Sequence, residues 1–193
     1  MILEKKASAK ERILRVASVL FYQEGVRAVG IDRIIEESGV AKASFYRNFA
    51  TKDDLVVAYL EQFYKRHMEE IEEAKRRYPE NPVEQLYVVL ECVSARMEKP
   101  GYRGCPFLNA AVEFPDANHP VHERVTAYHK ETYGKIAEIA KHAGAADPEA
   151  FAAQLTILFN GSLMTAYLER PNSNSGHLRH AAAFLFEKHK LGS

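Results

Sequence analysis

The stretch IDRIIEESGVAKASFYRNFATKDD, residues 31–54, decides the fold of this chain, because it has the pattern of two short helices joined by a tight turn. Ile34 and Ile35 give the first helix an apolar face. Gly39 can end that helix, because a residue without Cβ adopts the left-handed conformation at little cost. A second helix of about two turns is then predicted from residue 42 to residue 49.

The second predicted helix carries small and hydrogen-bonding side chains on its outward positions. Phe45 and Phe49 are spaced i, i+4, so we expect them to anchor this helix inward. The outward positions are Lys42, Ala43, Ser44, Arg47 and Asn48. Such side chains fit the major groove of DNA, where Arg and Asn can pair with two atoms of guanine and adenine. The pattern therefore predicts a helix-turn-helix, and double-stranded DNA is the first partner to consider.

These residues resemble the DNA-binding domain of the TetR/AcrR family of bacterial transcriptional regulators. The matching elements are the I-x-x-x-x-G-V turn at 34–40, the run SFYRNF at 44–49 and the run TKDDL at 51–55. The similarity covers roughly the first quarter of the chain closely, and the rest resembles the family in length and helical layout. One departure is Ala41, where the family usually has Ser or Thr to cap the recognition helix. The missing cap should cost about 1 kcal/mol.

The resemblance also implies which residues contact DNA. Tyr46 and Lys52 match positions that contact the phosphate backbone in the family, and Lys52 opens a helix whose dipole favours an anion. Arg33, early in the preceding helix, is a further candidate. The predicted DNA-binding residues are Arg33, Lys42, Ala43, Ser44, Tyr46, Arg47, Asn48 and Lys52. The alternative interpretation is that Tyr46 is partly core and the charges form only a solvated face.

Length and composition are consistent with a cytoplasmic helical protein. The chain has 193 residues, of which 47% are hydrophobic. No apolar run approaches the ~20 residues that a membrane span needs, and the N-terminus lacks a secretory apolar segment, so we expect no membrane partner. Lys and Arg together number 26, as do Asp and Glu, while residues 1–54 hold ten basic against eight acidic residues. This balance permits a local basic patch and argues against general polyanion binding.

The remaining pattern predicts an all-α fold of about nine helices. A capping box of Ser8 and Glu11 should start the first helix, and Thr51 should cap a long fourth helix that ends near Tyr78. Further helices are expected at 83–99, 106–114, 120–142, 148–169 and 175–189. The predicted domains are a three-helix DNA-binding domain at 1–54 and a helical ligand-binding and dimerisation domain at 55–193. The helix at 55–78 connects them.

The family resemblance implies that the C-terminal domain binds a small-molecule effector, which releases DNA only if it prefers the conformer that does not bind DNA. In the segment GYRGCPFLNAAVEF, residues 101–114, Asn109 and Glu113 share one face of a short apolar helix. Buried polar groups there need water, a polar partner or a ligand, and the alternative is hydrogen bonding to neighbouring helices. The candidate effector residues are Tyr87, Met97, Cys105, Phe107, Asn109, Glu113, Tyr128, Phe159 and Met164. They favour an apolar or aromatic effector with few charges, although such residues are more often plain core.

Cys105 offers an alternative input. It lies between Arg103 and the start of a predicted helix, and both features lower a thiol pKa. A regulator that senses redox state or electrophiles through Cys105 is therefore the alternative to a ligand-responsive one, and a buried structural cysteine is the simpler interpretation. With only Cys92 besides, no disulfide framework is expected.

The sequence indicates no enzyme, no metal site and no cofactor. His119, His122 and His129 lie in one region with Glu113, but that region has no H-x-x-x-H pair, and the chain has no E-x-x-H. The G-x-S-x-G motif of serine hydrolases is also absent from the sequence. A helical interaction module that does not bind DNA is the remaining alternative.

A homodimer through the last two helices is expected. These helices are unusually apolar, with Phe151, Leu155, Leu158, Phe159, Leu163 and Tyr167 on one and Leu178, Ala182, Phe184, Leu185 and Phe186 on the other. The family pairs them with their symmetry mates in a four-helix bundle, although burial within one chain could absorb much of the same surface. The sequence thus predicts a ligand-responsive transcriptional regulator, with repression from a palindromic operator favoured over activation.

Overall fold

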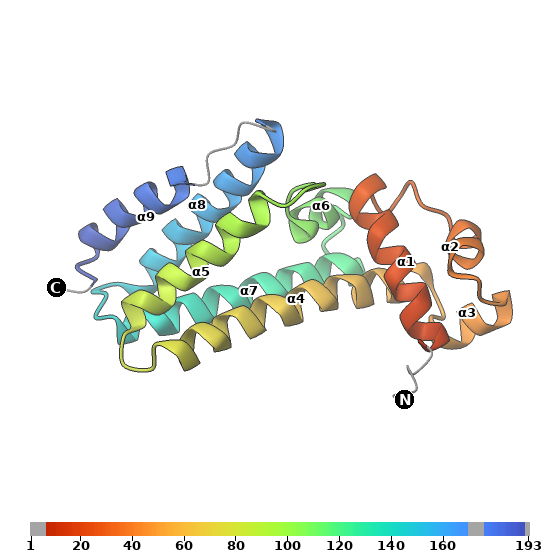
Figure 1. The fold of residues 1–193 in the computed structure, drawn as a ribbon, viewed down its shortest axis with the longest axis horizontal. Helices are drawn as coiled ribbons and strands as arrows, with labels where there is room; N and C mark the ends of the chain where they lie inside the picture. Colours follow the sequence, from red (N-terminus) through yellow and green to blue (C-terminus); the bar gives the residue numbers. More distant parts are fainter. Residues whose placement is uncertain (1–6, 170–175, 192–193) are drawn as a thin grey trace, which may run out of the picture. The chain divides into compact units, whose positions relative to one another are not determined.

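The computed structural model describes residues 7–169 and 176–191, and every regular element within them is an α-helix (Figure 1). The helices are α1 (Ala9–Glu24), α2 (Ile31–Ser38), α3 (Lys42–Asn48), α4 (Lys52–Arg77), α5 (Pro82–Met97), α6 (Pro106–Glu113), α7 (Pro120–His142), α8 (Pro148–Leu168) and α9 (Gly176–Lys188). The predicted all-α fold is confirmed, and the limits predicted for the five helices after residue 82 differ from these by at most two residues. The gap between the helices expected at 148–169 and 175–189 lies outside the described residues.

The predicted caps of two helices in the N-terminal region are present. The Ser8 hydroxyl accepts a hydrogen bond from the Glu11 amide at 3.2 Å, and the Glu11 carboxylate accepts one from the Ser8 amide at 2.7 Å. Thr51 and Asp54 repeat this reciprocal pair at the start of α4, at 3.0 and 2.9 Å. Both pairs satisfy amide donors that have no partner within the helix.

The turn between α2 and α3 depends on Gly39, as predicted. Its φ of 61° and ψ of 35° are left-handed, and its amide donates to the Glu36 carbonyl at 3.1 Å. The Val40 amide then donates to the Ile35 carbonyl at 3.4 Å, which closes the end of α2. A Cβ on this glycine would meet only the Arg12 guanidinium, at 3.8 Å, so the glycine is required by backbone conformation and not by space.

The described chain forms two compact units. The first contains the chain up to Phe63 together with Pro106–Val125, and the second contains Tyr64–Cys105 and the chain from Thr126 onward. Both α4 and α7 pass from one unit to the other. The domain limit predicted at residue 54 stays a prediction, whereas the compact units divide within α4, and α6 belongs with the helix-turn-helix.

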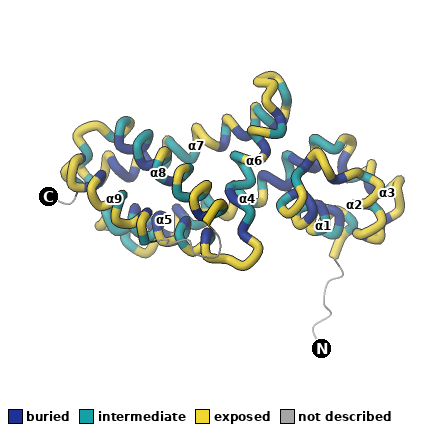
Figure 2. Tube along the Cα trace, turned by 90° about the horizontal axis from the view of Figure 1, so that it is seen from above, coloured by how far each residue is buried: buried dark blue, intermediate teal, exposed yellow. Residues whose placement is uncertain are grey.

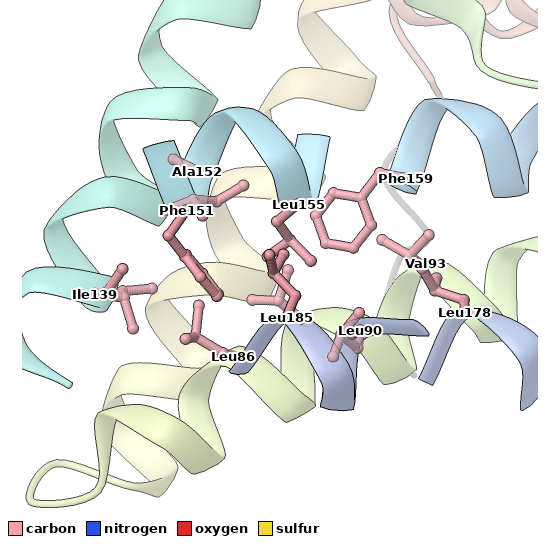
Figure 3. Packing of buried hydrophobic residues seen from close by; sticks show 14 of the residues in the cluster. Leu86, Leu90, Val93, Ile139, Phe151, Ala152, Leu155, Phe159, Leu178 and Leu185 are labelled. Atoms are coloured by element: carbon pink, nitrogen blue, oxygen red, sulfur yellow. The ribbon is translucent and has the colours of Figure 1, made fainter. Parts of the chain in front are cut away.

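Each unit has an apolar core formed by one face of its helices. Along the helices, buried positions recur between exposed ones (Figure 2). In the second unit, α5, α7, α8 and α9 contribute to one cluster (Figure 3). Its labelled members are Leu86, Leu90, Val93, Ile139, Phe151, Ala152, Leu155, Phe159, Leu178 and Leu185. Ile71 of α4 is also part of this cluster.

Among the described helices, only α8 is both long enough and apolar enough to span a membrane. It has 21 residues, a mean hydropathy of 1.2 over its most apolar stretch, and only 28% of that stretch is buried. Contrary to the expectation that no stretch of the chain approaches a membrane span, it meets that length and composition, as core helices of soluble proteins also can. The helix is apolar both on the face that packs in the core and on the opposite face.

Candidate nucleic-acid interface

The recognition helix α3 is held in place by its two phenylalanines. Phe45 is fully buried and Phe49 is 4% exposed, and their rings lie 6.3 Å apart between centroids. The Phe49 amide donates to the Phe45 carbonyl at 2.9 Å and ends the helix. The N-cap is Ala41, whose side chain makes no capping hydrogen bond, as expected for alanine.

The side chains opposite these anchors face solvent. Lys42, Ala43 and Arg47 are exposed. No described residue forms a recorded hydrogen bond or ion pair with the Arg47 side chain. Its guanidinium can therefore reach a base edge or a phosphate without breaking an existing contact.

Two of the predicted contact side chains on this helix, those of Asn48 and Lys42, already have partners within the chain. The Asn48 amide donates to the Ser44 carbonyl at 2.7 Å, which leaves the Asn48 carbonyl oxygen as an acceptor. The Lys42 ammonium lies 3.1 Å from the Asp32 carboxylate, and this pair raises the pKa of Lys42. Both side chains of the pair are largely exposed, so the pair is weak and can give way to a phosphate.

Tyr46 is 44% exposed, and its ring meets that of Phe45 edge-on, with 5.3 Å between centroids. The ring is thus packed on one side while the residue stays accessible, so the two interpretations given above for this tyrosine are compatible. A partly packed phenol keeps few rotamers, which lowers the entropy cost of a phosphate contact.

Arg33 and Lys52 are less available than the sequence suggests. The Arg33 guanidinium donates to both carboxylate oxygens of Glu24, at 2.6 and 2.9 Å, and to Glu37 at 2.7 Å. These contacts raise the pKa of Arg33 and occupy most of its donors. Lys52 is half-buried, and burial lowers its pKa against the opposing effect of Glu113.

Glu113 joins α6 to the helix-turn-helix. Its carboxylate accepts hydrogen bonds from the backbone amides of Val26, at 3.1 Å, and Arg27, at 2.7 Å. Gly25, at the end of α1, has a φ of 92°, and a Cβ there would lie 3.3 Å from the Glu113 carboxylate. The sequence pointed to Glu113 as an effector residue, and it had no local signal for this contact, because the partners are 86 and 87 positions away.

The other effector candidates are divided between the two units. Phe107 and Asn109 lie with Glu113 in the first unit, and Asn109 is exposed. The second unit holds Tyr87, Met97, Cys105, Tyr128, Phe159 and Met164. Met97 and Phe159 belong to the apolar core, while Met164 is 49% exposed. Tyr87 packs on Phe186, at 4.9 Å between ring centroids.

The two cysteines are partly buried, and His119 and His122 contact other residues of the first unit. Cys92 and Cys105 are half-buried and form no disulfide in the described chain, and burial raises the pKa of Cys92. His119 lies 3.4 Å from the Asp53 carboxylate, and His122 hydrogen-bonds to the Phe114 carbonyl at 2.7 Å. Within the described ranges, no three His, Cys, Asp or Glu side chains are grouped closely enough to hold a metal ion.

A short exposed helix anchored by aromatic residues and preceded by a glycine-capped helix defines a helix-turn-helix DNA-binding protein. Two family profiles match the chain: "Bacterial regulatory proteins, tetR family" over residues 13–59, and "Tetracyclin repressor-like, C-terminal domain" over residues 82–182. The chain belongs to the TetR family of transcriptional regulators. This family consists of DNA-binding transcription factors, so the chain is a regulator and not an enzyme.

Known relatives agree with this assignment. A TetR-family transcriptional regulator from Streptomyces coelicolor is 34% identical, covers 94% of this chain and 95% of its own, and superposes with a TM-score of 0.89. A protein from Streptomyces avermitilis described as a "putative tetr-transcriptional regulator" is 26% identical, and the match covers 96% of this chain and 100% of that chain with a TM-score of 0.81. An uncharacterized helix-turn-helix regulator from Lactococcus lactis is 25% identical over 132 residues, which are 68% of this chain and 67% of that protein.

Proposed function

We propose that this protein is a cytoplasmic repressor that binds a palindromic operator as a homodimer and is released from it by a small-molecule effector. The observation that carries the proposal is the exposed face of α3, where Arg47 has no recorded partner in the described chain and Lys42 and Tyr46 are accessible. One such helix makes few phosphate contacts. Two of them on a two-fold operator double the contacts and the affinity that depends on them.

An exposed apolar stripe on α8 supports the dimer. Ile157 and Leu168 are 70% and 73% exposed, and Met164 lies between them at 49%. Gly161 is also exposed, and a Cβ there would meet nothing within 4 Å. The spacings i, i+4, i+7 and i+11 place these four residues on one face of the helix.

Helix α9 adds Phe184, which is 75% exposed, in the same unit. Exposed apolar side chains at helical spacing mark interaction surfaces. A glycine within the α8 stripe allows two helices to approach closely. A second copy of this chain presents the same stripe, so the two surfaces complement each other by symmetry.

An effector would act by changing the equilibrium between conformers with different affinities for DNA. The hydrogen bonds from the amides of Val26 and Arg27 to Glu113 connect α6 directly to the loop before α2. A related fold is known with a small molecule, since a transcriptional regulator from Saccharomonospora viridis was solved in complex with choline. That protein is 19% identical to this chain, so it supports the presence of an effector and not its identity.

The test is selection of duplexes from a random pool, followed by fluorescence anisotropy of the purified full-length protein. We expect convergence on a palindrome and a loss of at least about tenfold in affinity for Arg47→Ala, because a charged contact is removed. Arg76→Ala is the matched control, since Arg76 is a largely exposed arginine of the second unit whose only partner among the described residues is Glu73. Absence of any enriched sequence at low salt, or equal losses in the two variants, would contradict the proposal.

A further inference from the structure

An arginine of α1 contacts the turn of the helix-turn-helix. The terminal nitrogen Nη1 of Arg12 donates a hydrogen bond to the Gly39 carbonyl at 3.3 Å. The two residues are 27 positions apart and belong to the same compact unit. Helix α1 packs against both α2 and α3 (Figure 1). The hydrogen bond therefore joins the helix that supports the motif to the residue at which the chain changes direction.

The carboxyl end of α2 requires a cation that α2 itself does not provide. The last turn of α2 contains Glu36 and Glu37 and no basic residue. The carbonyl groups at the end of a helix carry partial negative charge, so acidic side chains there are unfavourable and a guanidinium is favourable. Arg12 supplies this cation from a different helix, at the carbonyl that directly follows α2.

The Arg12 side chain is enclosed as well as hydrogen-bonded. Its Nε atom is buried and has no hydrogen-bond partner in the described part of the chain. A buried donor without a partner destabilises the fold, because it has lost its hydrogen bonds to water. An arginine at this position thus carries a cost in stability, which favours a role beyond stabilising the domain.

The turn that Arg12 contacts determines the direction in which α3 begins. Helix α3 starts three residues after Gly39, and its N-cap, Ala41, makes no side-chain hydrogen bond. The start of α3 therefore depends on the turn before it for its orientation. Hydrogen bonds to base edges require exact placement of the donor atoms, whereas attraction to phosphates depends mainly on charge.

We propose that Arg12 is a positioning residue for sequence-specific DNA binding. Through the Gly39 carbonyl it fixes the turn, and the turn fixes the direction in which Arg47 and the other outward side chains of α3 meet the bases. This inference rests on the operator recognition in the proposed function and adds to it a residue of α1 that acts through the turn. Loss of Arg12 lowers the discrimination between the operator and other DNA.

The test compares Arg12→Met with wild type by anisotropy, on the selected operator and on a random-sequence duplex of equal length. Methionine keeps an apolar stem and removes both the donor to Gly39 and the Nε donor. We expect operator binding at least about tenfold weaker and binding to the random duplex changed by less than about twofold. The salt slope on the random duplex should stay the same, because the number of phosphates contacted does not change.

Two further variants separate position from charge. Arg12→Lys keeps the charge and a donor for the Gly39 carbonyl, so its operator affinity should lie within about threefold of wild type. Arg15→Met removes a positive charge from an exposed position of the same helix and should leave both affinities within about twofold of wild type. Equal losses of Arg12→Met on both duplexes, with a salt slope lower by about one, would identify Arg12 as a direct phosphate contact and overturn the proposal.

Urea unfolding distinguishes positioning from a purely structural role. Arg12→Met loses one hydrogen bond and one buried donor without a partner, so its unfolding midpoint should stay close to that of wild type. A lower midpoint with unchanged operator affinity would show that Arg12 only stabilises the domain, and would overturn the proposal.

A readout on the unmodified protein guards against a variant that fails to fold. In nitrogen-resolved NMR near room temperature, Arg12 should show two distinct Nη resonances, because the contact with Gly39 restricts rotation of the guanidinium. Arg15 should show one averaged resonance, and an averaged resonance for Arg12 would overturn the proposal. Tight operator binding by both wild type and Arg12→Met rejects this inference alone. Failure of the wild type to select any operator rejects the repressor function and this inference with it.

Discussion

Ala41 shows how one residue at the recognition helix can be tested without touching the DNA-facing side chains. Its φ of −68° and ψ of 144° are those of an N-cap, but a methyl group cannot accept the hydrogen bond that a cap supplies. We expect Ala41→Ser to raise the free energy of unfolding by about 1 kcal/mol. Urea unfolding followed by circular dichroism measures the change. Ala43→Ser, within the same helix and also exposed, should give no gain, and equal effects of the two serines would contradict the capping argument.

His67 makes a second prediction at the residue scale, on the pH dependence of stability. Its pKa is lowered from 6.5 to about 3 in the folded protein, so between these pH values the unfolded chain binds the additional proton. The His67 contribution to stability is complete above pH 6.5 and is lost as the pH falls. The loss is at most about 1.4 kcal/mol per pH unit.

The measurement is a series of urea unfolding curves from pH 7 to pH 4 on wild type and His67→Phe. The wild type should lose stability more steeply as the pH falls, since the other groups near this position, Glu70, Cys92 and Arg96, are present in both proteins. Parallel pH profiles would show that His67 is not buried in its neutral form.

Single residues were predictable where the partner is close in the sequence. Gly39, and the capping pair of Ser8 with Glu11, depend on contacts within a few positions, so local patterns identify them. Arg33 was predicted as a DNA contact from its position early in α2, and its pairing with Glu24, nine positions away in a different helix, has no local sequence signal. The contact of His67 Nδ1 with the Arg96 guanidinium, at 3.2 Å, could not be inferred at all, because the sequence does not show which polar atoms of α4 and α5 meet.

At the scale of elements, α6 is the helix whose role depends most on one contact. Replacing Glu113 by Gln removes the charge and turns one acceptor into a donor that faces a backbone amide. We expect amide hydrogen exchange at Val26 and Arg27 to accelerate about tenfold or more, because hydrogen bonds to a charged group contribute about 1.5–3 kcal/mol. Glu123→Gln, at an exposed position of α7, is the control. Unchanged exchange at both amides would show that α6 does not hold this loop.

In the proposed dimer, the two apolar faces of α8 have different roles. Its inward face, with Phe151 and Leu155, fills the core, and its exposed stripe begins at Ile157. Ile157→Glu should raise the dissociation constant of the dimer by at least about 100-fold, because an unpaired charge would be buried in the interface. Sedimentation velocity over a concentration series measures this. Val112→Glu, at an 81% exposed valine of α6, should leave the assembly unchanged.

The sequence predicted that α8 and α9 are apolar but not which of their residues face outward. Phe184 and Phe186 are two positions apart, yet Phe186 is 3% exposed and Phe184 is 75% exposed. A helix that is apolar all round gives no amphipathic pattern, so periodicity cannot separate the core face from an interface. Only the packing of the second unit makes that distinction.

At the scale of the whole molecule, each compact unit combines segments that are not consecutive in the sequence. Local pattern places a limit after the helix-turn-helix, at residue 54. The first compact unit instead takes in the start of α4 and the separate segment Pro106–Val125. This segment is far along the chain and joins the unit through the Glu113 contact and the ion pair of Arg124 with Glu61, at 3.3 Å. Contacts between distant segments have no sequence period, so local pattern does not indicate them.

One measurement on the whole molecule tests the proposed dimer and the proposed DNA contacts together. Lys and Arg side chains that contact DNA phosphates release counterions, so the logarithm of the affinity falls with the logarithm of the salt concentration in proportion to the number of phosphates contacted. A dimer with two copies of α3 contacts about twice as many phosphates as a single chain.

Ile157→Glu should therefore bind the operator more weakly and with a salt slope about half that of wild type. Arg47→Ala should lower the slope by a smaller step while the protein stays dimeric. Val112→Glu should keep the wild-type slope, and a full slope in monomeric Ile157→Glu would mean that one chain alone makes all the phosphate contacts.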